Sequence, residues 1–109
     1  PPQEYNLPLT EGITEQVHAS YCKSQEGLVF ISGWVKGAAK SGTIAILPVG
    51  YRPRYAQQIV VPQSSDSDKN DTARIEIYTS GEIRLIGVGN EARIADGLSL
   101  CCSFPTLGS

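Results

Sequence analysis

The 109-residue chain has no methionine, one histidine, one tryptophan and only 18 % charged residues. Because translation starts at methionine, a chain that begins Pro1-Pro2-Gln3 is expected to be a piece of a longer polypeptide. Its apolar runs are far shorter than the roughly 18 residues of a membrane-spanning helix. No basic stretch followed by an apolar one marks a signal peptide. The net charge of -2 excludes a general electrostatic attraction to nucleic acid.

Cysteine is scarce as well, and its spacing argues against metal binding. Cys101 and Cys102 are adjacent, and neighbouring cysteines rarely bridge one another because the geometry is strained. Cys22 could pair with at most one of them. Without a CxxC pair, a zinc site is not expected. We expect three reduced, half-buried strand residues that act as small apolar groups.

The side chains that catalysis usually requires are few. His18 lies on the polar side of an alternating segment, and about 13 Å would separate it from Cys22 along a strand, which argues against a dyad. Asp66 and Asp68 lie in a polar loop without the spacing of an EF-hand. We expect that loop to be solvated, with a weak calcium site as the alternative. The sequence therefore predicts a non-catalytic protein with no cofactor and no resident metal.

What the sequence does contain is a hydrophobic period of two rather than 3.6. On one segment Val17, Ala19 and Tyr21 share a side, and Trp34 lies in a nearly continuous apolar run, where we expect a core role rather than a ligand platform. The expected strands are residues 13–21, 28–35, 43–47, 58–61, 73–78, 82–86 and 98–104. About seven short strands separated by turn residues predict an all-β fold, a small antiparallel barrel or sandwich.

The domain organisation follows from the prolines at the start of the chain. Residues 1–12 contain three prolines and no sustained periodicity, so we expect an extended linker or neck remnant there. The folded domain is expected to span residues 13–109. Helix is expected only as a single turn around residues 91–95. Residues 87–89 resemble a glycine-rich nucleotide loop, but no helix follows them, so we expect a bulge or strand-end turn.

One hairpin can be specified in register. A three-residue loop ending at Gly81 pairs Ile77 with Ile83 and Glu76 with Arg84, which matches apolar with apolar and opposite charges with each other. Gly81 would then occupy the left-handed position of a type I turn plus bulge. The outward face of this hairpin would display Arg74, Glu76, Tyr78, Glu82, Arg84 and Ile86.

Several polar side chains are candidates for holding sugar hydroxyls. Planar donors and acceptors come from Arg74, Glu76, Arg84, Arg93 and Asp96. The alternative is an ordinary ion-paired sheet face. Tyr51 and Tyr55 flank an Arg-Pro-Arg turn, where exposed tyrosine and arginine suit binding, although a tyrosine packed over its own loop is as common.

Four segments together resemble a known family. Residues 47–53 (LPVGYRP) are similar to a turn near the C-terminus of many phage tail-fibre and baseplate proteins. The hairpin at residues 74–87, the last strand at 98–104 and the early strand at 27–35 resemble the other elements of those domains in order and spacing. The resemblance covers about residues 15–104. It is nearest to the C-terminal head domains of receptor-binding proteins from lactococcal siphophages.

The resemblance implies a homotrimeric head at the distal tail tip or baseplate of a virion. Such heads bind saccharides or phosphopolysaccharides of the bacterial cell wall, at sites between subunits, without catalysis. Other tail proteins would be contacted through a missing N-terminal part, and neither nucleic acid nor membrane is an expected partner. The alternative is a structural trimerisation module without a ligand. A depolymerase would need two placed acids and a long groove, which so short a chain is not expected to supply.

The resemblance also implies which residues contact the saccharide. In the family the contacts come from the hairpin and from the loop before the last strand. On matching positions these are Arg74 and Glu76 on the hairpin and Arg93 and Asp96 on the loop. Leu85 and Ile86 stand where the family often has an aromatic ring, and this departure suggests either another aromatic side chain or a different saccharide. The reserve candidates for the saccharide site are His18 and Tyr55.

Overall fold

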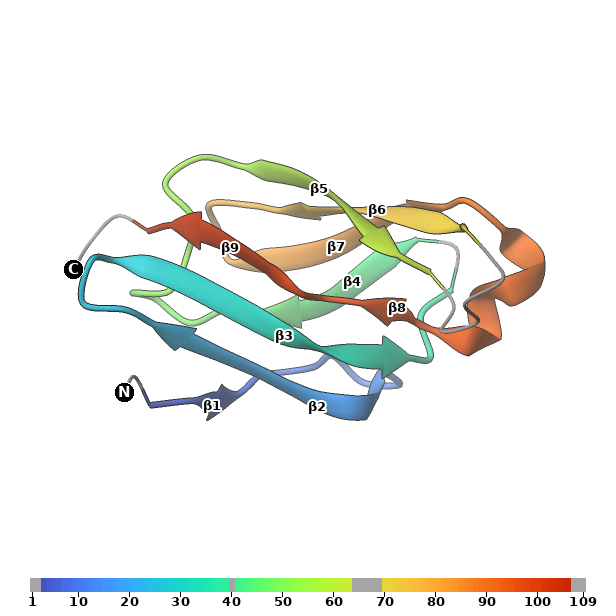
Figure 1. Ribbon diagram of the computed structural model, residues 1–109, viewed down its shortest axis with the longest axis horizontal. Helices are drawn as coiled ribbons and strands as arrows, with labels where there is room; N and C mark the ends of the chain where they lie inside the picture. Colours follow the sequence, from blue (N-terminus) through green and yellow to red (C-terminus); the bar gives the residue numbers. More distant parts are fainter. Residues whose placement is uncertain (1–2, 40, 64–69, 107–109) are drawn as a thin grey trace.

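The structure is a computed structural model that describes residues 3–39, 41–63 and 70–106 (Figure 1). Its elements are β1 (Tyr5–Asn6), β2 (Thr14–Lys23), β3 (Leu28–Lys36), β4 (Gly42–Ile46), β5 (Gln57–Pro62), β6 (Thr72–Ile77), β7 (Glu82–Val88), the 3-10 helix η1 (Glu91–Asp96), β8 (Leu98–Ser99) and β9 (Cys102–Pro105). The described part contains no helix with the length and apolar character needed to cross a membrane. The all-β prediction is confirmed.

The strands form two antiparallel sheets that face each other (Figure 1). Sheet A has the order β1-β2-β3-β8, with β9 also paired to β3, and sheet B has the order β4-β7-β6-β5. The core lies between them, because each strand turns alternate side chains inward. On β3, for example, Val29, Ile31 and Val35 are buried while Leu28 and Phe30 are exposed.

Both seams between the sheets are bridged, which gives the sandwich a barrel-like closure. On the β5 side, Gln63, just after β5, bridges to Leu98, the first residue of β8. On the β4 side, Leu9 bridges to Ala45, and the Ile46 amide donates to the Pro8 carbonyl at 3.2 Å. These bridges pair backbone groups that would otherwise lie along open sheet edges.

The segment expected to be a separate lead-in packs on the sandwich. Tyr5–Asn6 is extended, as predicted, but it pairs with β2 as an edge strand of sheet A. Leu7 is buried in the core, and its amide donates to the Ala19 carbonyl at 3.0 Å. The sequence signal for this contact is weak because the flanking prolines conceal a strand of only two residues.

Two side-chain expectations and one strand expectation are wrong. Val17 is 60 % exposed rather than on the core side, because register shifts interrupt the alternation of β2 on both sides of it. Trp34 is half-buried on the outer face of sheet A and not in the core. Residues 98–104 form two short strands rather than one, because Leu100 leaves the ladder and donates its amide to the Gly33 carbonyl at 2.9 Å.

The β6–β7 hairpin has the predicted register. Ile77 pairs with Ile83 and Glu76 pairs with Arg84. Gly81 has φ +92°, the left-handed conformation that the turn requires. The Tyr78 amide closes the turn by donating to the Glu82 carbonyl at 2.9 Å.

The LPVGYRP turn, residues 47–53, is tied to the tip of this hairpin. The Leu47 amide donates to the Gly81 carbonyl at 2.8 Å, and Arg52 Nε donates to the Leu47 carbonyl at 2.9 Å. A β-carbon on Gly81 would overlap the Leu47 carbonyl oxygen and lie 2.6 Å from Arg52 Nε. Thr106 Oγ1 donates to the Arg52 carbonyl at 2.6 Å. The motif therefore has a structural role, which is to connect the hairpin to the last strand.

The molecule is elongated, with principal extents of 41 × 25 × 25 Å. In Figure 1, η1 forms the right end, whereas β1 and the end of β9 lie toward the left. We call these the η1 end and the chain-entry end. Polypeptide that precedes β1 would approach the sandwich from the chain-entry end.

Candidate functional site

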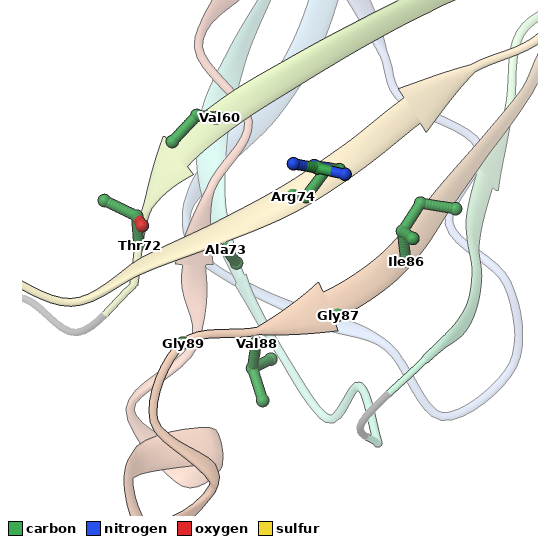
Figure 2. Close-up of a pocket in the computed structure, with 8 residues that line it drawn as sticks. All are labelled: Val60, Thr72, Ala73, Arg74, Ile86, Gly87, Val88 and Gly89. Atoms are coloured by element: carbon green, nitrogen blue, oxygen red, sulfur yellow. The ribbon is translucent and has the colours of Figure 1, made fainter.

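A shallow hollow lies on the outer face of sheet B, toward the η1 end (Figure 2). Its volume is about 300 Å³. Three neighbouring strands build it: β5 supplies Val60, β6 supplies Arg74 and β7 supplies Ile86. Val60 and Ile86 are exposed apolar side chains, and the Arg74 side chain lies between them in Figure 2. We call this feature the Arg74 hollow.

Arg74 is an exposed cation on the outer face of sheet B. Within the described part of the chain it forms no ion pair, although its sheet face also carries Glu76 and Glu82. Arg84 instead pairs with Glu82, with Nη1 3.3 Å from Oε2. The Thr43 hydroxyl also hydrogen-bonds Glu82 and, with Arg84, holds the pKa of that carboxyl below its usual value. The Arg74 guanidinium is left with its donor fork available to a ligand.

Glycine creates the space beside Arg74. Gly87 pairs directly with Arg74 across the ladder, and a β-carbon added to it would meet nothing within 4 Å. Ile86 is the extra residue of a bulge at this point, which turns its side chain outward beside the gap. Gly89 permits a close backbone approach, since a β-carbon there would lie 2.5 Å from the Thr72 carbonyl oxygen. Residues 87–89 were predicted to be a bulge or a strand-end turn; β7 ends at Val88, and the bulge lies one position earlier, at Ile86.

A second hollow of about 460 Å³ adjoins the first and shares Val60 and Thr72 with it. Asn70 and Asp71 add polar groups to its wall. The two hollows together form an elongated depression around the ends of β5 and β6.

The predicted site residues occupy four separate places. Glu76 lies two residues from Arg74 on the same face of β6, beside Tyr78. Desolvation, followed by the Glu76 carboxyl, raises the pKa of the Tyr78 hydroxyl. The remaining four candidates lie elsewhere: Arg93 and Asp96 on η1, His18 on β2, and Tyr55 in the loop before β5.

Arg93 and Asp96 form an ion pair that is joined to Trp34. Arg93 Nε lies 2.6 Å from Asp96 Oδ2, and Trp34 Nε1 donates to the Asp96 carbonyl at 2.8 Å. Gly97 follows with φ +83°, and a β-carbon there would lie 2.7 Å from Trp34 Nε1. This arrangement holds η1 against β3.

The two reserve candidates lie in exposed positions away from the hollow. His18 Nδ1 lies 3.3 Å from Glu15 Oε1, and the same carboxyl accepts the Ala19 amide at 2.8 Å. The Ala19 hydrogen bond, with a smaller contribution from His18, lowers the pKa of Glu15. Tyr55 is 71 % exposed and belongs to the chain-entry half of the molecule, in the loop that bridges to Thr106.

The sequence placed Arg74 among the candidates but not the residues that make the hollow around it. Arg74 pairs with Val60 on the β5 side and with Gly87 on the β7 side. The sequence offered two signals for the hollow. One is an apolar residue, Val60, at a solvent-facing position of a predicted strand, and the other is a glycine, Gly87, within a strand. They become informative only once the strand order β7-β6-β5 is known.

The cysteines form no disulfide. Cys22 and Cys102 are half-buried, as expected, but Cys101 is exposed. Burial, with a contribution from Cys101, raises the pKa of the Cys102 thiol to about 12. Asp66 and Asp68 lie outside the described residues, and among those described no cluster of His, Cys, Asp or Glu could hold a metal ion.

Neither a family model nor a curated protein matches this chain. Solved structures do, and two phage proteins are among them. The receptor-binding protein gp15 of Listeria phage PSA superimposes with a TM-score of 0.77 at 24 % identity, over 97 % of this chain and 66 % of that one. The head domain of the lactococcal phage bIL170 gives a TM-score of 0.63 at 16 % identity, over 98 % of this chain and all of that one. The chain has the fold of phage receptor-binding head domains. This chain spans about two thirds of the length of the Listeria phage protein.

Proposed function

We propose that this chain is the non-catalytic head domain of a phage receptor-binding protein and that it binds a saccharide of the bacterial envelope at the Arg74 hollow. The supporting observation is an exposed arginine that forms no ion pair with any described residue and lies between two apolar side chains, on a fold shared with two phage receptor-binding proteins. The proposed location is the distal tail tip or baseplate of a virion.

The chemistry of the hollow suits a sugar, including a phosphorylated one. A guanidinium donates two parallel hydrogen bonds to a pair of hydroxyls or to a phosphodiester. Val60 and Ile86 offer apolar contacts to the C–H groups of a ring held above Arg74. Glu76, on the same face, offers acceptors to further hydroxyls.

A depression this open cannot enclose most of a ligand, so each copy should bind weakly. Phage attachment would then depend on several copies acting together, because linked binding events multiply the apparent affinity. A homotrimer supplies such copies, with other tail proteins contacted through chain outside these residues. The position of the hollow toward the η1 end, opposite to chain entry, would direct it at the host.

The test is adsorption of phage, or of fluorescent protein, to susceptible cells. We expect Arg74→Ala to reduce binding at least tenfold, since loss of a charged bidentate donor costs about 1.5–3 kcal/mol. The matched control is Arg54→Ala, another exposed arginine whose loop lies in the chain-entry half. Equal binding by the wild type and the Arg74→Ala variant would exclude the hollow as the receptor site.

The second candidate function is a structural module that assembles tail subunits without a ligand. The bridged seams and the LPVGYRP turn would serve that role equally well. It predicts that no envelope saccharide binds the chain at millimolar concentration, and that Arg74→Ala leaves adsorption intact. A reducing-end assay on envelope polysaccharide, with no release expected, tests the proposed absence of catalysis.

A further inference from the structure

The outer face of sheet B continues past the Arg74 hollow toward the tip of the β6–β7 hairpin. Arg74, Glu76 and Tyr78 alternate with the buried residues Ile75 and Ile77, so these three side chains share the outer face. Arg74 and Tyr78 are four residues apart, which corresponds to about 13 Å along an extended strand. A second group of side chains therefore lies within reach of any extended ligand that occupies the hollow.

Tyr78 is the aromatic member of this second group, and it is held firmly. It is half-buried, its amide donates to the Glu82 carbonyl, and its carbonyl accepts the Gly81 amide, both at 2.9 Å. Desolvation, followed by the charge of Glu76 and a hydrogen bond with it, raises the pKa of the Tyr78 hydroxyl. A ring that is fixed in this way loses little conformational entropy when a ligand packs on it.

Polar side chains flank the Tyr78 ring. Glu76 pairs in the ladder with exposed Gln58 on β5 and with Arg84 on β7. Arg84 is bonded to Glu82, so the Gln58 amide and the Glu76 carboxyl are the polar groups that remain beside the ring. An amide, a carboxylate and an aromatic ring on one surface can bind the hydroxyls and the C–H face of a sugar.

The two ends of this face differ in charge. Arg74 is the only ionisable residue among those that line the hollow, which gives that end a positive charge. Around Tyr78 the carboxylates of Glu76 and Glu82 outnumber the guanidinium of Arg84, which leaves that end negative. An anionic group is therefore attracted to the Arg74 end and repelled from the Tyr78 end.

We propose that one acidic oligosaccharide of the envelope binds both ends of this face in a fixed direction. Arg74 holds its anionic group, a phosphodiester or a carboxylate, while Tyr78, Glu76 and Gln58 hold a neutral sugar ring of the same chain. The inference rests on the proposed function, since it takes the Arg74 hollow as the first subsite. The C–H face of the neutral ring packs on Tyr78, and its hydroxyls donate to Glu76 and accept from Gln58.

The separation of the two subsites sets the length of the ligand. A span of about 13 Å is longer than one sugar ring, so a monosaccharide occupies one subsite only and an oligosaccharide occupies both. The neutral ring lies toward the hairpin tip and the anionic group toward the η1 end. Tyr78 then supplies the aromatic contact that Leu85 and Ile86 do not provide on β7.

The test uses two probes that differ in length. Inorganic phosphate should bind at Arg74 alone, whereas acidic oligosaccharides released from the envelope of susceptible cells and sorted by size should reach both subsites. Tyr78→Ala should weaken oligosaccharide binding about three- to tenfold, as expected for an aromatic contact, and leave phosphate binding unchanged. Tyr78→Phe, which keeps the ring, should retain most of the affinity. The matched control is Phe30→Ala, which removes an exposed ring from sheet A and should change neither affinity.

Nuclear magnetic resonance of the wild-type chain gives a second readout, which decides the matter even if Tyr78→Ala does not fold. The Arg74 amide should shift with both probes. The Glu76 and Tyr78 amides should shift with the oligosaccharide and not with phosphate. Circular dichroism checks that each variant keeps its fold.

The outcomes separate this inference from the proposed function. Unchanged oligosaccharide binding by a folded Tyr78→Ala, or no shift at Glu76 and Tyr78, overturns the second subsite and leaves the Arg74 hollow in place. Neutral oligosaccharides that bind as tightly as acidic ones of the same size overturn the assignment of an anionic group to Arg74. Unchanged binding of both probes by Arg74→Ala excludes the hollow itself, and the two-ended site with it.

Discussion

Two glycines with nearly the same backbone conformation allow a sharp test of how the hairpin is held. Gly81 has φ +92° and Gly27 has φ +87°. A β-carbon at Gly27 would meet nothing within 4 Å, whereas at Gly81 it would overlap the Leu47 carbonyl oxygen and approach Arg52 Nε to 2.6 Å. Alanine at each position therefore imposes the same backbone strain but a different steric cost.

The expected losses follow from these contacts. A left-handed conformation costs a non-glycine residue about 1–2 kcal/mol, partly offset by about 0.4–1 kcal/mol from the more restricted unfolded chain. Gly27→Ala should therefore lower the free energy of unfolding by about 1 kcal/mol. Gly81→Ala must also displace the Leu47–Gly81 and Arg52–Leu47 hydrogen bonds, each worth about 1 kcal/mol, so we expect about 3 kcal/mol.

The assay is urea unfolding followed by circular dichroism, at one protein concentration because association would shift the midpoint. The slope with urea should stay the same in both variants, so that the midpoint alone reports the change. Equal losses at the two positions would refute the reasoning, since they would mean that the turn at residues 47–53 adjusts to a β-carbon at no cost.

Two further predictions concern a buried amide and a buried thiol. Gln63 is 2 % exposed and exchanges two hydrogen bonds with the Asn90 backbone, at 2.7 and 3.0 Å, so Gln63→Leu should cost about 2–4 kcal/mol in urea unfolding. Gln58→Leu, on the exposed face of β5, should change stability by less than about 0.5 kcal/mol, and similar losses for both would contradict the assignment. A pKa of about 12 leaves about one Cys102 thiol in ten thousand ionised at pH 8, so iodoacetamide should label exposed Cys101 first. Mass spectrometry of the peptide at early times reads the order, and labelling of Cys102 before Cys101 would show that the thiol is not buried in solution.

The sequence was sufficient for the hairpin because two independent signals agreed there. Only one register places Ile77 opposite Ile83 and Glu76 opposite Arg84, and Gly81 occurs where that register needs a left-handed residue. The expected ion pair between Glu76 and Arg84 does not form in this way, and Arg84 instead bonds Glu82 on its own strand. The reason is that a paired register does not fix the side-chain rotamers.

The sequence was insufficient where the alternation breaks. Two register shifts in β2 turn Val17 to solvent, and a bulge has no reliable signature in a single sequence. Trp34 was assigned to the core because large hydrophobic residues are usually buried. On β3, however, the inward position next to it is taken by Gly33, and the alternation of the strand turns Trp34 to the outer face. The Arg74 hollow depends on residues from three strands, and strand order cannot be derived from spacing alone.

The most direct measurement of the central claim is where a saccharide contacts the molecule. Nitrogen-15-labelled chain would be titrated with oligosaccharides released from the envelope of susceptible cells, and amide shifts would be mapped on the structure. The account predicts saturable changes that are largest at Arg74, Ile86 and Gly87 and that are absent in Gly87→Val, a substitution that adds bulk to the hollow at a position where a β-carbon meets nothing within 4 Å. Changes centred on Trp34 and Asp96, or the same response in Gly87→Val, would contradict it.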